Sequence, residues 1–202
     1  MNKNRIKKLS ALAETKFLNL YDVEYEKKNG KTGQWAMASR KDLETLNGQC
    51  FENREEKTDA AIIAALHEKS NKLVCIRQFR VPLNDYIYEL PAGLIDGEED
   101  FEESAARELR EETGFKLAKI NHEKTRKRIY ASPGMTDESA AMVFCTCTGD
   151  GSDQQLEEEE DIEVMLLSQE EVKALLKKDV KIDIKAYMVF QAFVEIGEKL
   201  FK

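Results

Sequence analysis

The sequence predicts an α/β protein in which a mixed β-sheet is packed between layers of helices. Predicted strands lie on both sides of one strongly charged helix in the middle of the chain, and two further helices are predicted near its end. This arrangement of elements is typical of a sheet that is covered by helices on both faces. The 202 residues are enough for one complete core with a small appended element.

Residues 1–55 are expected to form this appended element, which is mainly β-structure. Residues 1–11 are basic and polar, and we expect them to be frayed or lightly docked. Phe17–Tyr25 alternates apolar with polar residues, and Gln34–Ser39 follows a turn at Asn29-Gly30, so these segments predict a hairpin. The charged link Lys41–Asp59 has little periodicity and is expected to be irregular.

Residues 56–202 are expected to form the main domain. Its predicted strands are Ala60–Leu66, Leu73–Phe79, Tyr86–Glu89, Phe115–His122, Arg126–Tyr130, Ala141–Thr148 and Ile162–Leu167. A short helix is predicted from a cap at Ser168 to about Lys178, with Glu170 or Glu171 completing a capping box. A second, amphipathic helix is predicted over Ile184–Leu200.

The segment Glu98–Thr113 is predicted to form the helix around which the main domain is organised. It is rich in Glu, Ala, Leu and Arg, which favour helices. Asp96 or Gly97 can supply its N-cap, and Gly114 is suited to end it.

Three carboxylates share one face of this helix. At about 100° per residue, Glu108 and Glu112 lie ~40° apart, and Glu111 lies ~60° to the other side of Glu108. Like charges at this spacing repel each other, and a solvated acidic face is the plain alternative. Here, however, the carboxylates border the apolar stripe that would pack on the sheet. Because oxygen ligands suit Mg²⁺ and Mn²⁺, we predict a divalent-metal site.

Composition argues against several classes of function. The net charge of −8 argues against a nonspecific nucleic-acid binder, which would carry basic patches. No apolar run approaches about 18 residues, so we expect no membrane span, and the start MNKNRIKKLS lacks the apolar core of a secretion signal. The four cysteines lack the spacing and the histidines of a zinc site, and we expect them to be reduced core residues of a cytoplasmic protein.

The central segment carries a long fixed pattern. Gly93 is followed after five residues by Glu99, and after seven more by the run RELREETGF at residues 107–115. This pattern, G-x5-E-x7-R-E-U-x-E-E-x-G-U with U apolar, resembles the signature of the Nudix hydrolases. The resemblance implies a Nudix-type α/β/α sandwich with a mixed sheet, in addition to the small N-terminal β element.

Residues on either side of this pattern narrow the resemblance to the ADP-ribose pyrophosphatase branch. The runs QFR at 78–80 and ELPAGLID at 89–96 lead into it, and YASPGMTDE at 130–138 follows it. The resemblance implies a metal-dependent enzyme that hydrolyses a small nucleotide sugar, in the first place ADP-ribose to AMP and ribose 5-phosphate. GDP-mannose or another nucleotide sugar is the alternative substrate. A non-catalytic nucleotide sensor is the alternative of another class, although such proteins usually lose carboxylates that are all present here.

The resemblance also implies roles for single residues. The Ala92 carbonyl, Glu108 and Glu112 would hold Mg²⁺, or Mn²⁺ in its place. Glu111 would be a further ligand, directly or through water, and is counted with the catalytic residues as well. Arg80 would contact the diphosphate, whose charge a guanidinium matches with two parallel hydrogen bonds.

The resemblance implies structural roles for two further residues and substrate contacts for two others. Arg107 and Glu99 would tie the loop before the helix to the helix itself. Trp35, the single tryptophan, falls where some family members stack the adenine ring, and Arg40 falls where they place a phosphate or base contact. Packing and surface charge are the plain alternatives for these two. The N-terminal hairpin is expected to be exchanged between the subunits of a homodimer, because a two-stranded unit is marginal alone.

The catalytic base is expected in the acidic run 157–161, EEEED, just before the strand Ile162–Leu167. The helix carboxylates would be committed to metal, whereas a loop can close over substrate. Relatives place a glutamate two residues before the apolar start of this strand, which selects Glu160, with Glu158 as runner-up. The plain alternative is a solvated acidic loop.

Overall fold

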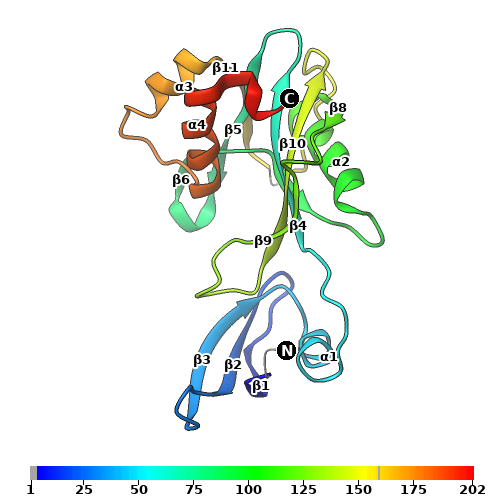
Figure 1. The fold of residues 1–202 in the computed structure, drawn as a ribbon, viewed down its shortest axis with the longest axis vertical. Helices are drawn as coiled ribbons and strands as arrows, with labels where there is room; N and C mark the ends of the chain where they lie inside the picture. Colours follow the sequence, from blue (N-terminus) through cyan, green and yellow to red (C-terminus); the bar gives the residue numbers. More distant parts are fainter. Residues whose placement is uncertain (1–3, 159) are drawn as a thin grey trace. The chain divides into compact units, whose positions relative to one another are not determined.

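The computed structural model describes residues 4–158 and 160–202, and these residues divide into two units (Figure 1). The first unit contains the chain up to Asp59 together with Tyr130–Ser139. The second contains Ala60–Ile129 and Ala140–Lys202. A segment far along the sequence therefore belongs with the N-terminal element.

The first unit carries an antiparallel sheet in the order β1 (Ile6–Ala13), β2 (Asn19–Glu26), β3 (Thr32–Ser39). The predicted hairpin is confirmed as β2 and β3. The expectation that residues 1–11 are frayed is wrong from Ile6 onward, because β1 pairs with β2. Leu9 is the single buried residue of β1, so its sequence lacks the alternation that reveals a half-buried strand.

A helix, α1 (Leu43–Phe51), lies in the link that was expected to be irregular. Asp42 caps it, and its Oδ1 accepts a hydrogen bond from the Thr45 N–H at 2.8 Å. Leu46 packs with Leu9, Tyr21 and Val23 in the small core of this unit. Packing of one leucine stabilises the helix without leaving a periodic apolar pattern in the sequence.

The second unit is built around a mixed sheet, as predicted. Its strands are β4 (Ala60–His67), β5 (Lys72–Arg80), β6 (Asp85–Glu89), β7 (Ala92–Leu94), β8 (Lys116–Ile120), β9 (Arg126–Tyr130), β10 (Ser139–Thr148) and β11 (Ile162–Leu167). The order is β11-β5-β4-β10-β8, with β6, β7 and β9 paired to β5, β4 and β10. β4 and β10 are parallel, whereas β4–β5, β5–β11 and β8–β10 are antiparallel. The predicted strands match these bounds to within two residues, and β7 was not predicted.

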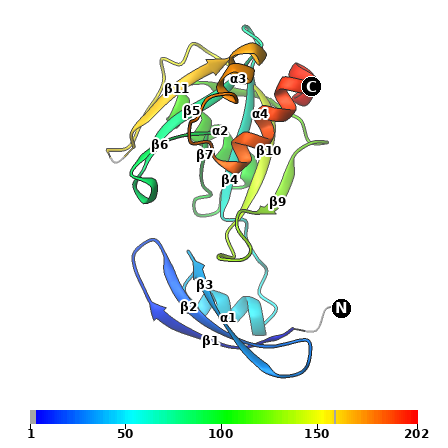
Figure 2. The same cartoon turned by 90° about the vertical axis from the view of Figure 1, so that its left-hand side faces the viewer.

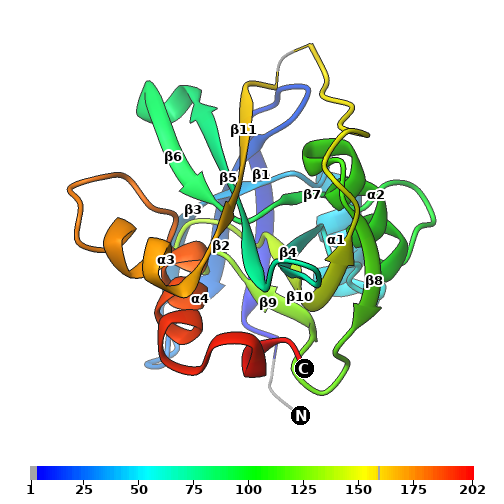
Figure 3. The same cartoon turned by 90° about the horizontal axis from the view of Figure 1, so that it is seen from above.

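Helices cover both faces of this sheet (Figure 3). Helix α2 (Phe101–Thr113) covers one face through Ala105 and Leu109. Helices α3 (Gln169–Leu175) and α4 (Ile184–Ile196) cover the other face and lie nearest the viewer in Figure 2. The predicted α/β/α sandwich is therefore confirmed. No helix in the described part of the chain has the length and apolar character needed to cross a membrane.

The sheet is split where the chain approaches α2. β4 and β5 pair only next to their connecting turn, at Leu66 opposite Leu73 and His67 opposite Lys72. Beyond it, β6 pairs with β5 and β7 pairs with β4. This split brings Ala92 and Gly93 onto the edge of β4, directly before the loop that leads into α2.

The N-cap of α2 differs from the prediction. Asp100, and not Asp96 or Gly97, caps the helix, with its Oδ1 accepting from the N–H groups of Glu102 and Glu103 at 2.8 and 2.9 Å. In return, Glu103 Oε2 accepts a hydrogen bond from the Asp100 N–H at 3.1 Å. Asp96 has the same spacing to Glu99, but the Glu99 carboxylate is taken by a side chain of the helix, as described below.

Helix α3 begins as predicted, with Ser168 as N-cap and Glu171 completing the box. Glu171 Oε2 accepts from the Ser168 N–H at 2.7 Å and from Lys72 Nζ at 3.0 Å. The Ser168 backbone bond, helped by Lys72, lowers the pKa of Glu171 from 4.5 to about 2. Because this pKa is lower in the folded state than in the unfolded one, the ionised carboxylate stabilises the fold.

Glu171→Gln is expected to lower the free energy of unfolding at neutral pH, because it removes this charge and keeps the shape. The difference from wild type should shrink as the pH falls from about 5 toward 2, where Glu171 becomes protonated in wild type as well. Urea titrations at several pH values measure this difference in the free energy of unfolding. Glu170→Gln, one position earlier in the same turn, is the control, and a pH-independent difference would contradict the assignment.

Candidate active site

The backbone of Gly93, in β7, lies directly against a side chain of α2. Gly93 pairs with Ala61 of β4. A Cβ atom added to Gly93 would lie 1.9 Å from Glu108 Cδ and 2.0 Å from Glu108 Oε1. The Glu108 carboxyl group therefore packs directly on the Gly93 backbone, and a larger residue at this position would displace it.

Glu112 is buried one helical turn beyond Glu108. Its side chain is 3% exposed, and its Oε2 accepts a hydrogen bond from the Ala92 N–H at 3.0 Å. Burial raises the pKa of Glu112 well above its ordinary value, and the charges of Glu108 and Glu160 add to this effect. Burial likewise raises the pKa of Glu108, with Glu111 and Glu160 contributing. Negative charge is thus concentrated beside Ala92 and Gly93.

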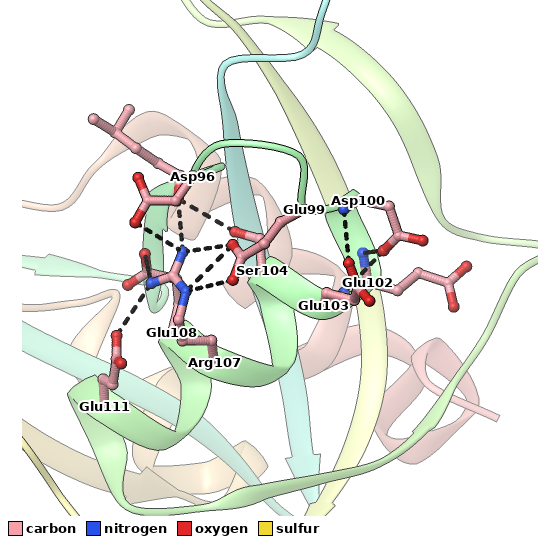
Figure 4. Close-up of polar contacts among 10 residues, drawn as sticks. Asp96, Glu99, Asp100, Glu102, Glu103, Ser104, Arg107, Glu108 and Glu111 are labelled. Carbon is pink, nitrogen blue, oxygen red and sulfur yellow. Dashed lines mark hydrogen bonds and ion pairs between the residues drawn. The ribbon is translucent and has the colours of Figure 1, made fainter.

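Arg107 forms ion pairs with Glu99, Glu108 and Glu111 (Figure 4). It donates from Nε to Glu99 Oε1 and from Nη2 to Glu99 Oε2, both at 3.0 Å, and Nη2 also reaches the Leu94 carbonyl at 3.0 Å. These contacts tie the loop to the helix, as the resemblance implied. In addition, Nη1 donates to Glu108 Oε1 at 2.7 Å and to Glu111 Oε2 at 3.1 Å.

Arg80, at the end of β5, faces the α2 side of the sheet. Side chains alternate along a strand, and Val74 of β5 packs in the cluster that contains Leu109 of α2, so Gln78 and Arg80 point to this side. Arg80 donates from Nε and Nη2 to the two carboxylate oxygens of Glu89, at 3.0 and 2.6 Å. The bond to Glu89 raises the pKa of Arg80, and the charge of Glu112 contributes to the rise.

Gln78 also lies on this face, and no role was predicted for it from the sequence. It is 8% exposed, and its Oε1 has no hydrogen-bond partner in the described part of the chain. A buried acceptor without a donor is costly. Its sequence signal was weak: a polar residue in an otherwise buried strand, within the run QFR.

One residue of the acidic run before β11, Glu160, interacts electrostatically with Glu108 and Glu112. Glu160 is half-buried, its Oε2 accepts from the Glu157 N–H at 2.9 Å, and its charge acts on both Glu108 and Glu112. Glu158 is exposed. Glu159 lies outside the described residues. Both Glu160 and Glu158 stay predictions for the catalytic base, and of the two only Glu160 contributes to the raised pKa of Glu108 and Glu112.

Trp35 and Arg40 belong to the first unit, whereas the other predicted site residues belong to the second. Trp35 is 53% exposed and donates from Nε1 to the Gly134 carbonyl at 3.1 Å. Arg40 forms an ion pair with Glu138, with Nε 2.7 Å from Oε1. Both residues thus hold the 130–139 segment in the first unit, a role that the sequence did not reveal.

The donor set beside Gly93 suits a hard divalent cation. Its candidate ligands are the oxygens of the Ala92 carbonyl, Glu108, Glu111 and Glu112, and a cation would relieve the concentrated negative charge that raises the pKa of Glu108 and Glu112. Within the described residues, no three Asp, Glu, His or Cys side chains are gathered closely enough to hold a metal as they stand. Arg107 engages only Oε1 of Glu108 and only Oε2 of Glu111, so its contacts leave one oxygen of each carboxylate to a cation.

Comparison with known proteins agrees with this geometry. The NUDIX domain family model matches residues 56–190. Nudix hydrolase 2 of Caenorhabditis elegans is 32% identical over 79% of this chain and 70% of the relative. The ADP-ribose pyrophosphatase of Bacillus subtilis is 31% identical, covering 79% of this chain and 84% of the relative.

Two further proteins extend the comparison. The ADP-sugar pyrophosphatase of Mus musculus is 28% identical over 69% of this chain and 59% of the relative. The crystal structure of an ADP compounds hydrolase has the same fold, with a TM-score of 0.65 at 19% identity and coverage of 96% of both chains. With its signature, its sandwich fold and its family match, this chain belongs to the Nudix hydrolase family and resembles the ADP-ribose pyrophosphatase branch.

Proposed function

We propose that this protein hydrolyses the diphosphate bond of a nucleoside diphosphate sugar, in the first place ADP-ribose to AMP and ribose 5-phosphate. The observation that carries the proposal is the partly exposed Arg80 guanidinium, which Glu89 holds on the face of the sheet that α2 covers, the helix that also carries Glu108 and the buried Glu112. A guanidinium next to a carboxylate cluster can bind a diphosphate beside the groups that hold its counter-ion. The names of the relatives from Bacillus subtilis and Mus musculus support ADP-linked substrates.

Nudix hydrolases generally use divalent metals, and we propose Mg²⁺, or Mn²⁺ in its place, bound by the Ala92 carbonyl, Glu108, Glu111 and Glu112. When bound, the ion would neutralise the diphosphate and acidify the attacking water. The chain supplies the positioning. The Ala92 N–H orients the Glu112 carboxylate, the Gly93 backbone supports Glu108, and Glu160 accepts the proton of the water as general base.

Gly93→Ala is expected to lower kcat/KM on ADP-ribose by at least about tenfold, because the Glu108 carboxyl group must leave its position. The fold should survive, since the atoms displaced are the flexible end of a side chain. Thermal melting and kinetics measure the two effects. Gly134→Ala is the control, because an added Cβ there meets nothing within 4 Å. Unchanged activity at limiting Mg²⁺ would contradict the assigned role of Gly93.

A substrate screen tests the proposed function. Purified protein is incubated with Mg²⁺ and with ADP-ribose, GDP-mannose and other nucleotide sugars side by side, and AMP, GMP and sugar phosphate are quantified. ADP-ribose is expected to have the highest kcat/KM. A higher kcat/KM for GDP-mannose would identify the protein as a GDP-mannose pyrophosphatase, the alternative within the same class of enzyme. Binding of ADP-ribose without hydrolysis would identify a nucleotide sensor and overturn the enzymatic proposal.

We propose in addition that the protein is a cytoplasmic homodimer whose first unit forms part of the subunit interface. The first unit exposes large apolar side chains, namely Leu12, Phe17, Leu18, Leu20 and Trp35. Exposed apolar groups of this kind favour association. Sedimentation at micromolar concentration measures the state, and a monomer would contradict the proposal. Quenching of Trp35 fluorescence by ADP-ribose tests the stacking role of this residue.

A further inference from the structure

In the described part of the chain, Arg80 is held by one partner through a two-pronged contact. The guanidinium donates from Nε and Nη2 to both oxygens of Glu89, at 3.0 and 2.6 Å. Two parallel hydrogen bonds fix both the position and the plane of a guanidinium, which one contact would not do.

The partner of Arg80 is not its neighbour in the sheet. Asp85 stands directly opposite Arg80 in the ladder between β5 and β6, but Asp85 pairs with Lys181. Glu89 stands opposite Ile76, four residues earlier on β5. The Arg80 side chain must therefore fold back along its own strand. This direction leads toward the end of β6, after which the chain reaches Ala92.

The two side chains of the Arg80–Glu89 pair differ in their exposure to solvent. The Glu89 side chain is 12% exposed, whereas that of Arg80 is 42% exposed. Nε and one N–H of Nη2 are used by Glu89, and Nη1 donates to no acceptor in the described part of the chain. The edge formed by Nη1 and Nη2 is thus available to an anion, while the opposite edge is anchored.

We propose that Glu89 is a positioning residue, which holds the Arg80 guanidinium so that its remaining edge receives the substrate diphosphate beside Glu112. The inference rests on the proposed function, in which Arg80 binds the diphosphate. Without Glu89, Arg80 would keep its charge but lose its anchor, and the carboxylates of α2 would compete for it.

The direction in which anion affinity changes when Glu89 is replaced separates a positioning role of Glu89 from an effect of its charge alone. Glu89 is negative, so if it acted only through its field, removing its charge would strengthen the binding of an anion. If it positions Arg80, removing it weakens the binding. Glu89→Gln removes the charge at constant shape, and Glu89→Asp keeps the charge but shortens the reach by one methylene.

The experiment compares Glu89→Gln and Glu89→Asp with wild type in two assays. Inorganic pyrophosphate is titrated by calorimetry in the presence of EDTA, and KM and kcat for ADP-ribose are measured with Mg²⁺. Both variants are expected to bind pyrophosphate about 10-fold to 100-fold more weakly and to raise KM by a similar factor. Asp85→Asn removes a charge from the same strand and is expected to behave as wild type in both assays.

A double variant tests whether Glu89 acts through Arg80. Lysine cannot form the two-pronged contact, so in an Arg80→Lys background the further change Glu89→Gln should alter pyrophosphate affinity by less than about twofold. Tighter or unchanged pyrophosphate binding in the single Glu89 variants, or additive losses in the double variant, would overturn the inference. If wild type hydrolyses no nucleotide sugar, the proposed function fails, and the pyrophosphate titrations still decide the role of Glu89.

Discussion

Glu160→Gln is expected to lower kcat on ADP-ribose by ~10²–10⁴-fold, which is the range for loss of a general base. In free energy of activation this corresponds to about 2.7–5.4 kcal/mol. The amide cannot accept the proton of the attacking water, but it keeps the size of the side chain and an oxygen for the Glu157 N–H. The fold and the affinity for Mg²⁺ should therefore be retained.

The pH profile makes this prediction specific. Wild type is expected to show an acidic limb in its kcat profile, and loss of the base should remove this limb, whereas a merely structural defect would lower the whole profile. Glu157→Gln, Glu158→Gln and Glu159→Gln are made singly as matched controls, and each should retain most of the activity. If all four variants lose less than about fivefold, the base lies outside this run or the metal alone activates the water.

Glu112→Gln is expected to reduce activity by at least ~10²-fold, or about 2.7 kcal/mol in transition-state stabilisation. The change removes one ligand charge from the centre of the proposed metal site. The fold should not suffer, because the glutamine Oε1 can still accept from the Ala92 N–H, and because an ionised carboxylate at this 3%-exposed position is costly to bury.

Three measurements separate the loss of a metal ligand from damage to the fold. Far-UV circular dichroism and the thermal midpoint of Glu112→Gln should match wild type or show a higher midpoint. The concentration of Mg²⁺ needed for half-maximal activity should rise strongly. Glu102→Gln, on the same helix and away from the cluster, should leave both activity and metal dependence unchanged. Near-full activity of Glu112→Gln at limiting Mg²⁺ would remove Glu112 from the metal site.

The sequence predicted the features that depend on neighbours along the chain. The spacing of Glu108, Glu111 and Glu112 on one helical face follows from 3.6 residues per turn and needs no knowledge of the rest of the fold. The stop at Gly114 likewise follows from its left-handed backbone, with φ of +72°. The shared carboxylate face of α2 and the strand pattern of the second unit could therefore be predicted, because both follow from local periodicity.

Two positions carry equivalent sequence signals for the N-cap of α2, and tertiary contacts decide between them. Asp96 and Asp100 both stand three residues before a glutamate, so the sequence could not choose the cap of α2. Arg107 decides the choice, because it engages Glu99 and leaves Glu103 to complete the box with Asp100. A side chain one turn or more away in the helix thus sets where the helix begins.

Other features have no local signal at all. Strand β1 buries only Leu9 and exists because β2 is beside it, and the 130–139 segment joins the first unit through contacts to Trp35 and Arg40. The partner of Arg80 is likewise nonlocal. The sequence by itself determined that three carboxylates share one face of α2, and the family resemblance singled out Arg80. Only the tertiary structure decided that Arg80 is anchored by Glu89 and not by Asp85, because side-chain reach and burial across strands, and not sequence distance, select an ion-pair partner.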